Sequence, residues 1–235
     1  MTQLSAKRTR LTLVATILLV FVFAISAVGQ TVSPPIAEYR GKASGMVELR
    51  NDGDFPLAAI LEVKGFVVNE QGTLLYTALD PKINVEFGAS SFVIPPHESH
   101  FVFYKTKSEL PSYWFAFLTT LTRANADKHQ MKVNFILPHV VYVYQKPKLK
   151  RTDVNVTLLT GDDGSLKLQI ENHSMKLARV QSVETHGFEK SLMLGGVPIF
   201  PAKQRFVEFS PGQHNSKANV EVVFEDGFTI TVPAS

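Results

Sequence analysis

Short stretches rich in β-branched and aromatic residues, separated by turn-forming residues, recur along almost the whole chain and constrain its fold more than any other feature. Residues 46–50 alternate between apolar and polar side chains and are followed at once by the turn sequence Asn-Asp-Gly-Asp. Alternation that ends in a tight turn is typical of a β-strand with one buried face. After residue 29, no ten-residue segment shows the 3.6-residue apolar repeat of an amphipathic helix. The chain is therefore predicted to be all-β.

The remaining predicted strands follow the same rule. In the first half they are residues 58–68, 91–94, 101–104, 113–121 and 131–144, and in the second half 154–159, 166–171, 180–185, 206–209, 220–224 and 228–232. About seven short strands in roughly 115 residues is the pattern of an immunoglobulin-like sandwich.

The two β-rich halves are separated by a basic, proline-containing stretch, residues 146–151, which has the composition of a linker. Each half also contains a strand that runs into a polar turn opening with asparagine, at Asn51 and at Asn172. We predict two tandem immunoglobulin-like β-sandwich domains, residues 30–146 and residues 147–235.

The N-terminal segment has a different character. Lys7, Arg8 and Arg10 precede an apolar run over residues 11–28, and small residues precede Gln30 at the positions that a signal peptidase requires. We therefore expect residues 1–29 to be a signal peptide that is cleaved near Gly29/Gln30, which leaves an exported chain without stable membrane insertion. The alternative is that residues 11–28 are retained as an anchor, although that run is at the short limit for crossing a bilayer.

Composition excludes several classes of function. The chain contains no cysteine, which rules out disulfides, zinc-thiolate sites, iron–sulfur clusters and a cysteine nucleophile. Of 24 basic residues three lie in residues 1–29, so the rest of the chain carries as many basic as acidic residues, 21 of each. A neutral body has no positive field for nucleic acid.

Motifs for catalysis are missing. The sequence has no nucleophile elbow, phosphate-binding loop or dinucleotide fingerprint. His97 and His100 are the one metal-like pair, but they follow two prolines in a turn that enters a strand, where alternation directs them to opposite faces. We expect exposed turn residues here, and we predict no catalytic residue, no metal and no cofactor.

One strand carries a candidate binding face. Met131, Val133, Phe135 and Leu137 alternate, so they share one face of the strand predicted over residues 131–144. From the pattern alone, we expect these side chains to fill the chain's own sandwich, as alternating faces usually do. Alternatively, a late strand at a sheet edge can lend its apolar face to an incomplete partner, with backbone hydrogen bonds providing affinity and side chains providing specificity.

Several motifs follow one another in a definite order along the chain: Ser-Pro-Pro at residues 33–35, and residues 47–56, 92–96, 113–117, 144–147, 166–172, 197–202 and 224–227. In the order and spacing of these motifs, the chain resembles the PapD-like periplasmic chaperones of the chaperone–usher pathway, and its overall character is closer to their archaic branch than to the P-pilus type. The resemblance implies two immunoglobulin-like domains in the periplasm that bind secreted fimbrial or pilus-type subunits by donor-strand complementation and deliver them to an outer-membrane usher.

The resemblance also implies roles for single residues. The donor positions fall on Val133, Phe135 and Leu137, with Met131 as an extension. In the P-pilus branch an arginine and a lysine bind the subunit's terminal carboxylate, but their places hold Pro35 and Tyr142 here. Lys146 and Arg205 are the candidate anchors instead. The competing interpretation is an exported structural or adhesive module of two sandwiches without chaperone activity.

Overall fold

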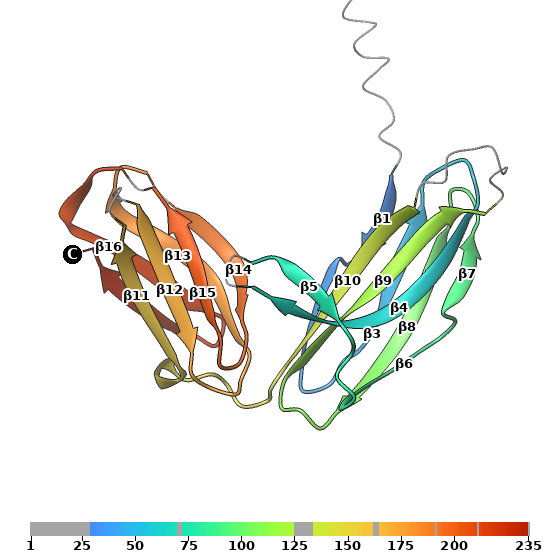
Figure 1. The fold of residues 1–235 in the computed structure, drawn as a ribbon, viewed down its shortest axis with the longest axis horizontal. Helices are drawn as coiled ribbons and strands as arrows, with labels where there is room; N and C mark the ends of the chain where they lie inside the picture. Colours follow the sequence, from blue (N-terminus) through green and yellow to red (C-terminus); the bar gives the residue numbers. More distant parts are fainter. Residues whose placement is uncertain are drawn as a thin grey trace, which may run out of the picture.

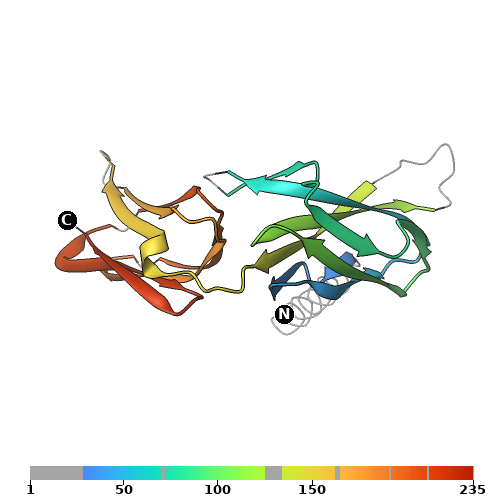
Figure 2. The same ribbon diagram turned by 90° about the horizontal axis from the view of Figure 1, so that it is seen from below.

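The computed structural model describes residues 29–69, 72–124, 134–161, 165–190, 192–210 and 212–234, and these form two β-sandwiches side by side (Figures 1 and 2). The strands of the first are β1 (Gln30–Ser33), β2 (Ile36–Arg40), β3 (Ser44–Asn51), β4 (Leu57–Val68), β5 (Leu74–Thr77), β6 (Ile83–Phe87), β7 (Ser91–Ile94), β8 (Ser99–Ser108), β9 (Tyr113–Arg123) and β10 (Asn134–Tyr144). A short 3₁₀ turn, η1 (Arg151–Asp153), precedes β11 (Val154–Thr160), β12 (Leu166–Asn172), β13 (Ala178–Phe188), β14 (Met193–Ile199), β15 (Gln204–Phe209), β16 (His214–Phe224) and β17 (Phe228–Pro233).

Each sandwich consists of two sheets. In the first, β1-β3-β8-β6 faces a sheet in the order β2-β10-β9-β4, in which β4 pairs with β7 along its first part and with β5 along its last. The second packs β11-β12-β15 against β14-β13-β16-β17. The hairpin of β4 and β5 reaches from the first domain toward the second (Figure 1).

Inward-facing alternate residues form a separate core in each sandwich. Val47 and Leu49 on β3 meet Phe115 and Phe117 on β9 in the first core. The second core is centred on Leu168 and similar aliphatic residues of β12, β13 and β16. Since the chain has no disulfide, these two cores and the hydrogen-bonded sheets hold the domains together.

The prediction of an all-β chain with two sandwich domains is confirmed. Every strand predicted from the pattern is present, although the ends differ by a few residues, and residues 131–133 at the start of β10 lie outside the described residues. Five short strands were not predicted: β1, β2, β5, β6 and β14. The expected signal peptide also falls almost entirely outside the described residues. The described part of the chain contains no helix with the length and hydrophobicity needed to cross a membrane.

The asparagine that ends β3 closes the end of the first sandwich. Asn51 is fully buried, and its side-chain amide group donates to the carbonyl oxygens of Phe55, Ile94 and Pro95. Its side-chain oxygen accepts from the N–H of Gly53. One side chain thereby joins the turn after β3 to the end of β7.

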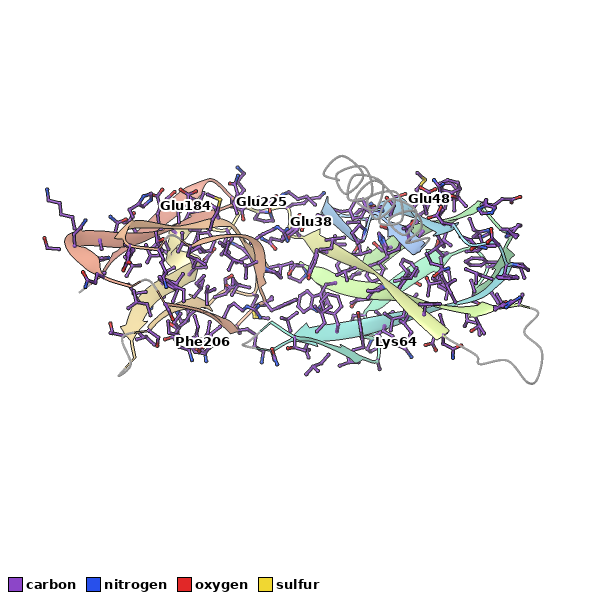
Figure 3. All side chains as sticks on the ribbon, turned by 90° about the horizontal axis from the view of Figure 1, so that it is seen from above. Glu38, Glu48, Lys64, Glu184, Phe206 and Glu225 are labelled. Carbon is purple, nitrogen blue, oxygen red and sulfur yellow. The ribbon has the colours of Figure 1, made fainter. Side chains whose placement is uncertain are left out.

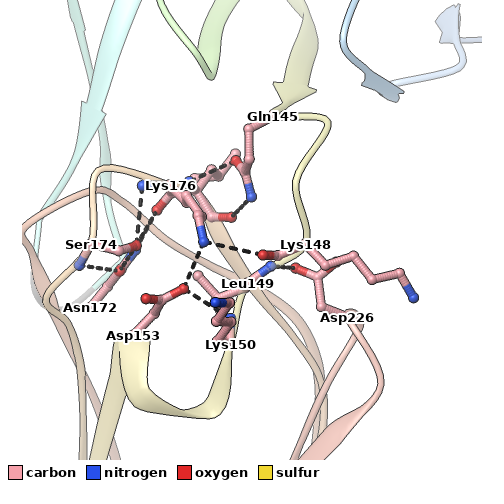
Figure 4. Close-up of polar contacts among 10 residues, drawn as sticks. Gln145, Lys148, Leu149, Lys150, Asp153, Asn172, Ser174, Lys176 and Asp226 are labelled. Carbon is pink, nitrogen blue, oxygen red and sulfur yellow. Dashed lines mark hydrogen bonds and ion pairs between the residues drawn. The ribbon is translucent and has the colours of Figure 1, made fainter.

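Asn172 repeats this arrangement at the end of β12. Its amide group donates to the carbonyl oxygens of Lys176, Ile199 and Phe200, and its oxygen accepts from the N–H of Ser174. Figure 4 shows the contacts with Lys176 and Ser174. In both domains the first carbonyl acceptor lies four residues after the asparagine, and the N–H that bonds to its side-chain oxygen lies two residues after it. The similarity of the two asparagine turns in the sequence thus reflects the same hydrogen-bonded corner.

Candidate functional site: the free edge of β10 and the interdomain junction

β10 is paired on both sides along only part of its length. Residues 140–144 lie between β9 and the parallel strand β2. Residues 134–139 pair with β9 alone among the residues that the structure describes. Pro138 lies in this stretch, and proline, which has no N–H, is tolerated in strands at a free edge. We call residues 134–139 the free segment of β10; its unpaired edge offers backbone groups to another strand.

The two faces of the free segment differ. Phe135 is 45% exposed, and Leu137 is half-buried against the first core. Further along the same face, Val141 and Val143 are fully buried in that core. Ile136, on the opposite face, is 61% exposed. One face of β10 therefore passes from a closed core to an open apolar surface, so a strand or domain added at this edge would continue the core.

Of the four predicted donor residues, the structure describes Phe135 and Leu137 and places them on this face; Met131 and Val133 lie outside the described residues.

His139 is the last residue of the free segment, and it is almost completely buried. Its Nε2 lies 3.1 Å from the Tyr104 hydroxyl, and its Nδ1 lies 2.5 Å from the Pro34 carbonyl oxygen. The Tyr104 hydroxyl is 2.9 Å from that of Tyr39. Burial lowers the pKa of His139, while the Pro34 carbonyl acts in the opposite direction. Hydrogen bonds thus tie the base of the free segment to β8 and to the corner between β1 and β2.

Apolar side chains from both domains form a third cluster, at the interdomain junction. Its buried members are Phe66, Ala116, Val140, Tyr142, Tyr144, Leu177 and Phe200. The Phe200 ring, from the second domain, lies with its centroid 4.6 Å from Trp114 and 6.2 Å from Phe66. Burial of large aromatic rings at such distances favours one fixed arrangement of the domains.

Gln145, directly after β10, binds the backbone of the second domain through its side chain at this junction. Its side-chain amide donates to the Leu177 carbonyl, and the Leu177 N–H donates to its side-chain oxygen, at 3.3 and 3.1 Å. Figure 4 shows the Gln145 side chain turned toward the second domain. The buried amide therefore has both of its polar atoms satisfied by the other domain.

Two groups of charged residues also cross the junction. Arg40 forms an ion pair with Asp226 at 3.0 Å, and its other terminal nitrogen donates to the Gln145 carbonyl. Arg179 lies between Glu38 of the first domain and Glu225 of the second, and Figure 3 shows these two glutamates at the boundary between the domains. Burial raises the pKa of Glu38, as does Glu225, whereas Arg179 acts against the shift.

The linker prediction needs a refinement. Leu149 is buried in the second core, and its N–H donates to Asp226 at 2.9 Å (Figure 4). Lys176 donates to the Lys148 carbonyl and also pairs with Asp153. Part of residues 146–151 is therefore attached to the second domain.

Four residues bear on the question of a carboxylate anchor: Pro35 and Tyr142, which occupy the positions of the anchors in the P-pilus branch, and the two candidates Lys146 and Arg205. Pro35 is exposed, and Tyr142 is buried in the junction cluster, where burial raises its pKa to about 12. Lys146 is exposed, and its aliphatic stem lies over Gly41. Arg205 donates to the Asn69 carbonyl at 2.8 Å, and its Nε is buried without a hydrogen-bond partner among the described residues.

Next to Arg205, the tip of the β4–β5 hairpin and the second domain enclose a cleft of about 810 Å³. Residues 67–69 line it from the first domain, and residues 171–173 and 202–204 line it from the second. Arg205 is thus the cation nearer to this cleft, because it bonds directly to the Asn69 backbone.

The histidine pair near β8 does not form a metal site. His97 is in a turn at φ 60° and bonds to Asp54, whereas the His100 ring stacks on Phe92 at 3.8 Å. The described ranges contain no group of three His, Cys, Asp or Glu side chains placed to bind a metal ion.

Sequence reasoning did not find the junction residues Phe66, Arg179 and Phe200. Each belongs to a strand or turn with an ordinary alternating pattern, and its partner lies in the other domain. The one local signal was Glu-Asp-Gly at residues 225–227, which was interpreted as a hairpin turn; the structure shows that its two acids also pair with Arg179 and Arg40.

Comparisons with known proteins place the fold. No protein-family model matches the sequence, and no curated protein matches it. Among solved structures, the SafB chaperone bound to the SafA pilin of Salmonella enterica has a TM-score of 0.57 at 11% identity, covering 89% of this chain and 98% of that one. The class 5 fimbriae chaperone CfaA has a TM-score of 0.55 at 11% identity, covering 88% of this chain and 100% of its own.

A third similar structure is the CsuC–CsuE chaperone–tip subunit pre-assembly complex of the archaic chaperone–usher Csu pili of Acinetobacter baumannii. Its TM-score is 0.50 at 15% identity, covering 87% of this chain and 97% of that chain. The chain therefore has the two-domain fold of the fimbrial chaperones, as the resemblance implied. The three TM-scores are too close to distinguish one kind of fimbrial chaperone from another.

Proposed function

We propose that this chain is a periplasmic chaperone that binds fimbrial or pilus-type subunits by donor-strand complementation, lending them the free segment of β10. The observation that carries the proposal is an unpaired strand edge combined with an apolar face that opens at Phe135. The likeness of the fold to chaperones solved with a pilin or a tip subunit supports the choice of partner.

The physical basis is strand addition. A subunit that lacks one strand exposes an apolar groove, and β10 offers it both backbone hydrogen bonds and alternating side chains. Phe135 and Leu137 would enter that groove, continued by Val133 and Met131. Each apolar side chain that becomes fully buried contributes about 1.5–3 kcal/mol, so three or four of them would hold a subunit that otherwise aggregates.

We also propose that the protein works in the periplasm and that it delivers the bound subunit to an outer-membrane usher. The supporting observations are the signal-peptide pattern of residues 1–29 and the fold shared with a chaperone of a chaperone–usher system. If the signal is cleaved, intact-mass analysis of protein from the periplasm will give a chain beginning at Gln30 or within two residues of it. Protein that keeps Met1 in the membrane fraction would replace this proposal with an anchor.

For the subunit's terminal carboxylate, we propose Arg205 ahead of Lys146 as the anchor. Its hydrogen bond to Asn69, a residue that lines the 810 Å³ cleft, places it beside that cleft and supports this choice. Arg205→Gln should weaken subunit binding at least about tenfold, because a charge-assisted hydrogen bond would be lost. Lys146→Gln is the matched variant; if it weakens binding instead, Lys146 is the anchor.

Co-expression with a fimbrial-type subunit, sought among the proteins encoded beside this chain, tests the function. The wild-type chain should co-purify with the subunit, and Phe135→Glu should abolish co-purification because a carboxylate would enter an apolar groove. Ile136→Glu introduces the same charge one residue away on the opposite face and should retain binding. Both variants should melt close to the wild type, since both side chains are exposed.

The structural-module interpretation predicts a different result. If Phe135 belongs only to the chain's own sandwich, Phe135→Glu should destabilise the protein strongly while Ile136→Glu does not. A folded Phe135→Glu protein that still binds the subunit would remove Phe135 from the site, and a wild-type chain that binds no neighbouring subunit would overturn the proposed function.

A further inference from the structure

With a neutral imidazole, the hydrogen-bonded chain through His139 has one consistent arrangement of protons. A carbonyl oxygen can only accept, so the imidazole donates from Nδ1 to Pro34. Nε2 then accepts from the Tyr104 hydroxyl, which in turn accepts from Tyr39. This arrangement requires a neutral imidazole.

The surroundings of His139 favour the neutral form. The Phe117 ring of β9 stacks on the imidazole at 26° with centroids 6.0 Å apart, and the Tyr104 ring of β8 lies at 5.6 Å. The titratable groups that face it are Tyr104 and, through Tyr104, Tyr39 of β2. Among the described residues, none of the side chains bonded to or stacked on His139 is a carboxylate or a cation. An imidazolium here would be buried without a counter-charge.

Gly45 on β3 makes room for this network. A Cβ atom at residue 45 would lie 1.9 Å from the Tyr39 hydroxyl, a distance that forces the Tyr39 ring to move, and 3.0 Å from the Tyr104 hydroxyl, which is a tight contact. The close approach of the two hydroxyls therefore depends on glycine at this position. β8, β9 and the β1–β2 corner thus contact the buried imidazole directly, and β2 and β3 complete the network around Tyr104.

The network is located at the C-terminal end of the free segment. Val140, the next residue, is the first of β10 to pair with β2, and its N–H donates to the Pro35 carbonyl at 2.9 Å. The bonds from His139 to Pro34 and from Val140 to Pro35 hold the β1–β2 corner on β10. Beyond them, toward Phe135, only β9 pairs with the strand among the described residues.

We propose that His139 is the positioning residue of the free segment, and that its protonation in acid loosens that segment and releases the bound subunit. The release of a subunit rests on the proposed function; the loosening does not. Protonation turns Nε2 into a donor, so the Tyr104 hydroxyl must reverse its hydrogen bond toward Tyr39 while the charge stays among aromatic rings. Acid exposure would then weaken the base of the strand that binds the partner.

The direction of the pH dependence follows from the lowered pKa of His139. The unfolded state binds the proton near the ordinary histidine value of about 6.5, whereas the folded state resists it to lower pH. The contribution of neutral His139 to the free energy of unfolding is therefore complete above about pH 6.5, and it declines as the pH falls toward the pKa of His139 in the folded state. Below the pKa of His139 in the folded state, this loss of stability no longer changes with pH.

Hydrogen exchange of the free chain tests the positioning role without any partner. After correction for intrinsic exchange, protection of the amides of residues 134–137 and 139 in the wild type should be lower at pH 5 than at pH 7.5, because the folded state resists protonation of His139. Residues 166–172 of β12 serve as the internal reference and should keep their protection. His139→Gln, which retains a donor and an acceptor but does not titrate, should show no such pH dependence.

Four results decide between the outcomes. Unchanged wild-type protection of residues 134–139 across this range overturns the proposal, even if His139→Gln fails to fold. Equal pH dependence in the wild type and in His139→Gln overturns it as well. Subunit binding is then measured at pH 7.5 and pH 5: absent binding at pH 7.5 contradicts the proposed function alone, while acid-insensitive binding contradicts the release.

Discussion

At the scale of single residues, Asn51 and Asn172 have the same structural role in the two domains. Each is buried at the end of a strand, and its amide bonds to three carbonyl oxygens from a turn and a distant strand end. A repeated asparagine turn is visible in the sequence, but the distant acceptors are not, because they lie 43 and 27 residues away.

Asn51→Ala should lower the free energy of unfolding by about 2 kcal/mol or more, because it leaves buried carbonyl oxygens without donors. Denaturant unfolding monitors the loss. Asn84→Ala on β6 is the matched control, since Asn84 is exposed, and it should change stability by less than about 0.5 kcal/mol. Similar small effects in both variants would show that the corner does not depend on the asparagine.

At the scale of elements, strand patterns were predictable where a strand is long and has one buried face. β4, β9 and β10 have eleven or twelve residues and stand out in the sequence. β1, β2, β5 and β6 have four or five residues, too few for a clear alternating pattern, whereas the equally short β7 was predicted because two prolines mark its end. β14 was missed although it has seven residues, because two adjacent glycines interrupt its pattern. The apolar face of β10 was predictable, but its free edge follows from β2 ending its pairing at residue 140.

The segment that connects the domains, residues 146–151, allows a separate prediction about protease cleavage. Asp226 accepts from Arg40 and from the Leu149 N–H, which fastens the chain after β10 to the second domain. Asp226→Ala should therefore accelerate tryptic cleavage at Lys148–Leu149 at least about tenfold, because hydrogen bonds to a charged group contribute about 1.5–3 kcal/mol. The masses of the fragments identify the bond; trypsin does not cut Lys146 before Pro147.

Asp52→Ala is the control for this experiment, since Asp52 also pairs with an arginine but on the surface of the first domain. It should leave the cleavage rate unchanged. First cleavage within either sandwich, or an unchanged rate in Asp226→Ala, would contradict the account of the connection.

At the scale of the whole molecule, the junction sets how the two sandwiches are held. Phe66 and Phe200 are separated by more than a hundred residues, and so are Glu38 and Arg179. No local periodicity links such pairs, so the two-domain architecture was predictable and the junction was not. The junction bears on function because Tyr142 and Tyr144, at the end of β10, belong to its cluster.

Phe200→Ala should loosen the junction while leaving both cores intact. The chain has a single tryptophan, and Trp114 packs on Phe200, so its emission should shift to the red as water reaches the indole. Small-angle scattering should show a larger radius of gyration. Phe206→Ala, on the second domain's own sheet with its ring under Lys167, is the control and should change neither signal. Unchanged emission and scattering in Phe200→Ala would mean that the cluster does not hold the domains.

The most direct test of the donated strand uses the absence of cysteine from the chain, which makes any introduced thiol unique in it. Phe135→Cys and Ile136→Cys place thiols on opposite faces of the free segment, where both native side chains are exposed. Maleimide labelling, read by mass spectrometry, should modify both free proteins. In the purified complex with the subunit, the thiol at 135 should be protected and that at 136 should remain reactive. Equal reactivity at 135 in the free protein and in the complex, or protection at 136 alone, would contradict the insertion of this face into the subunit.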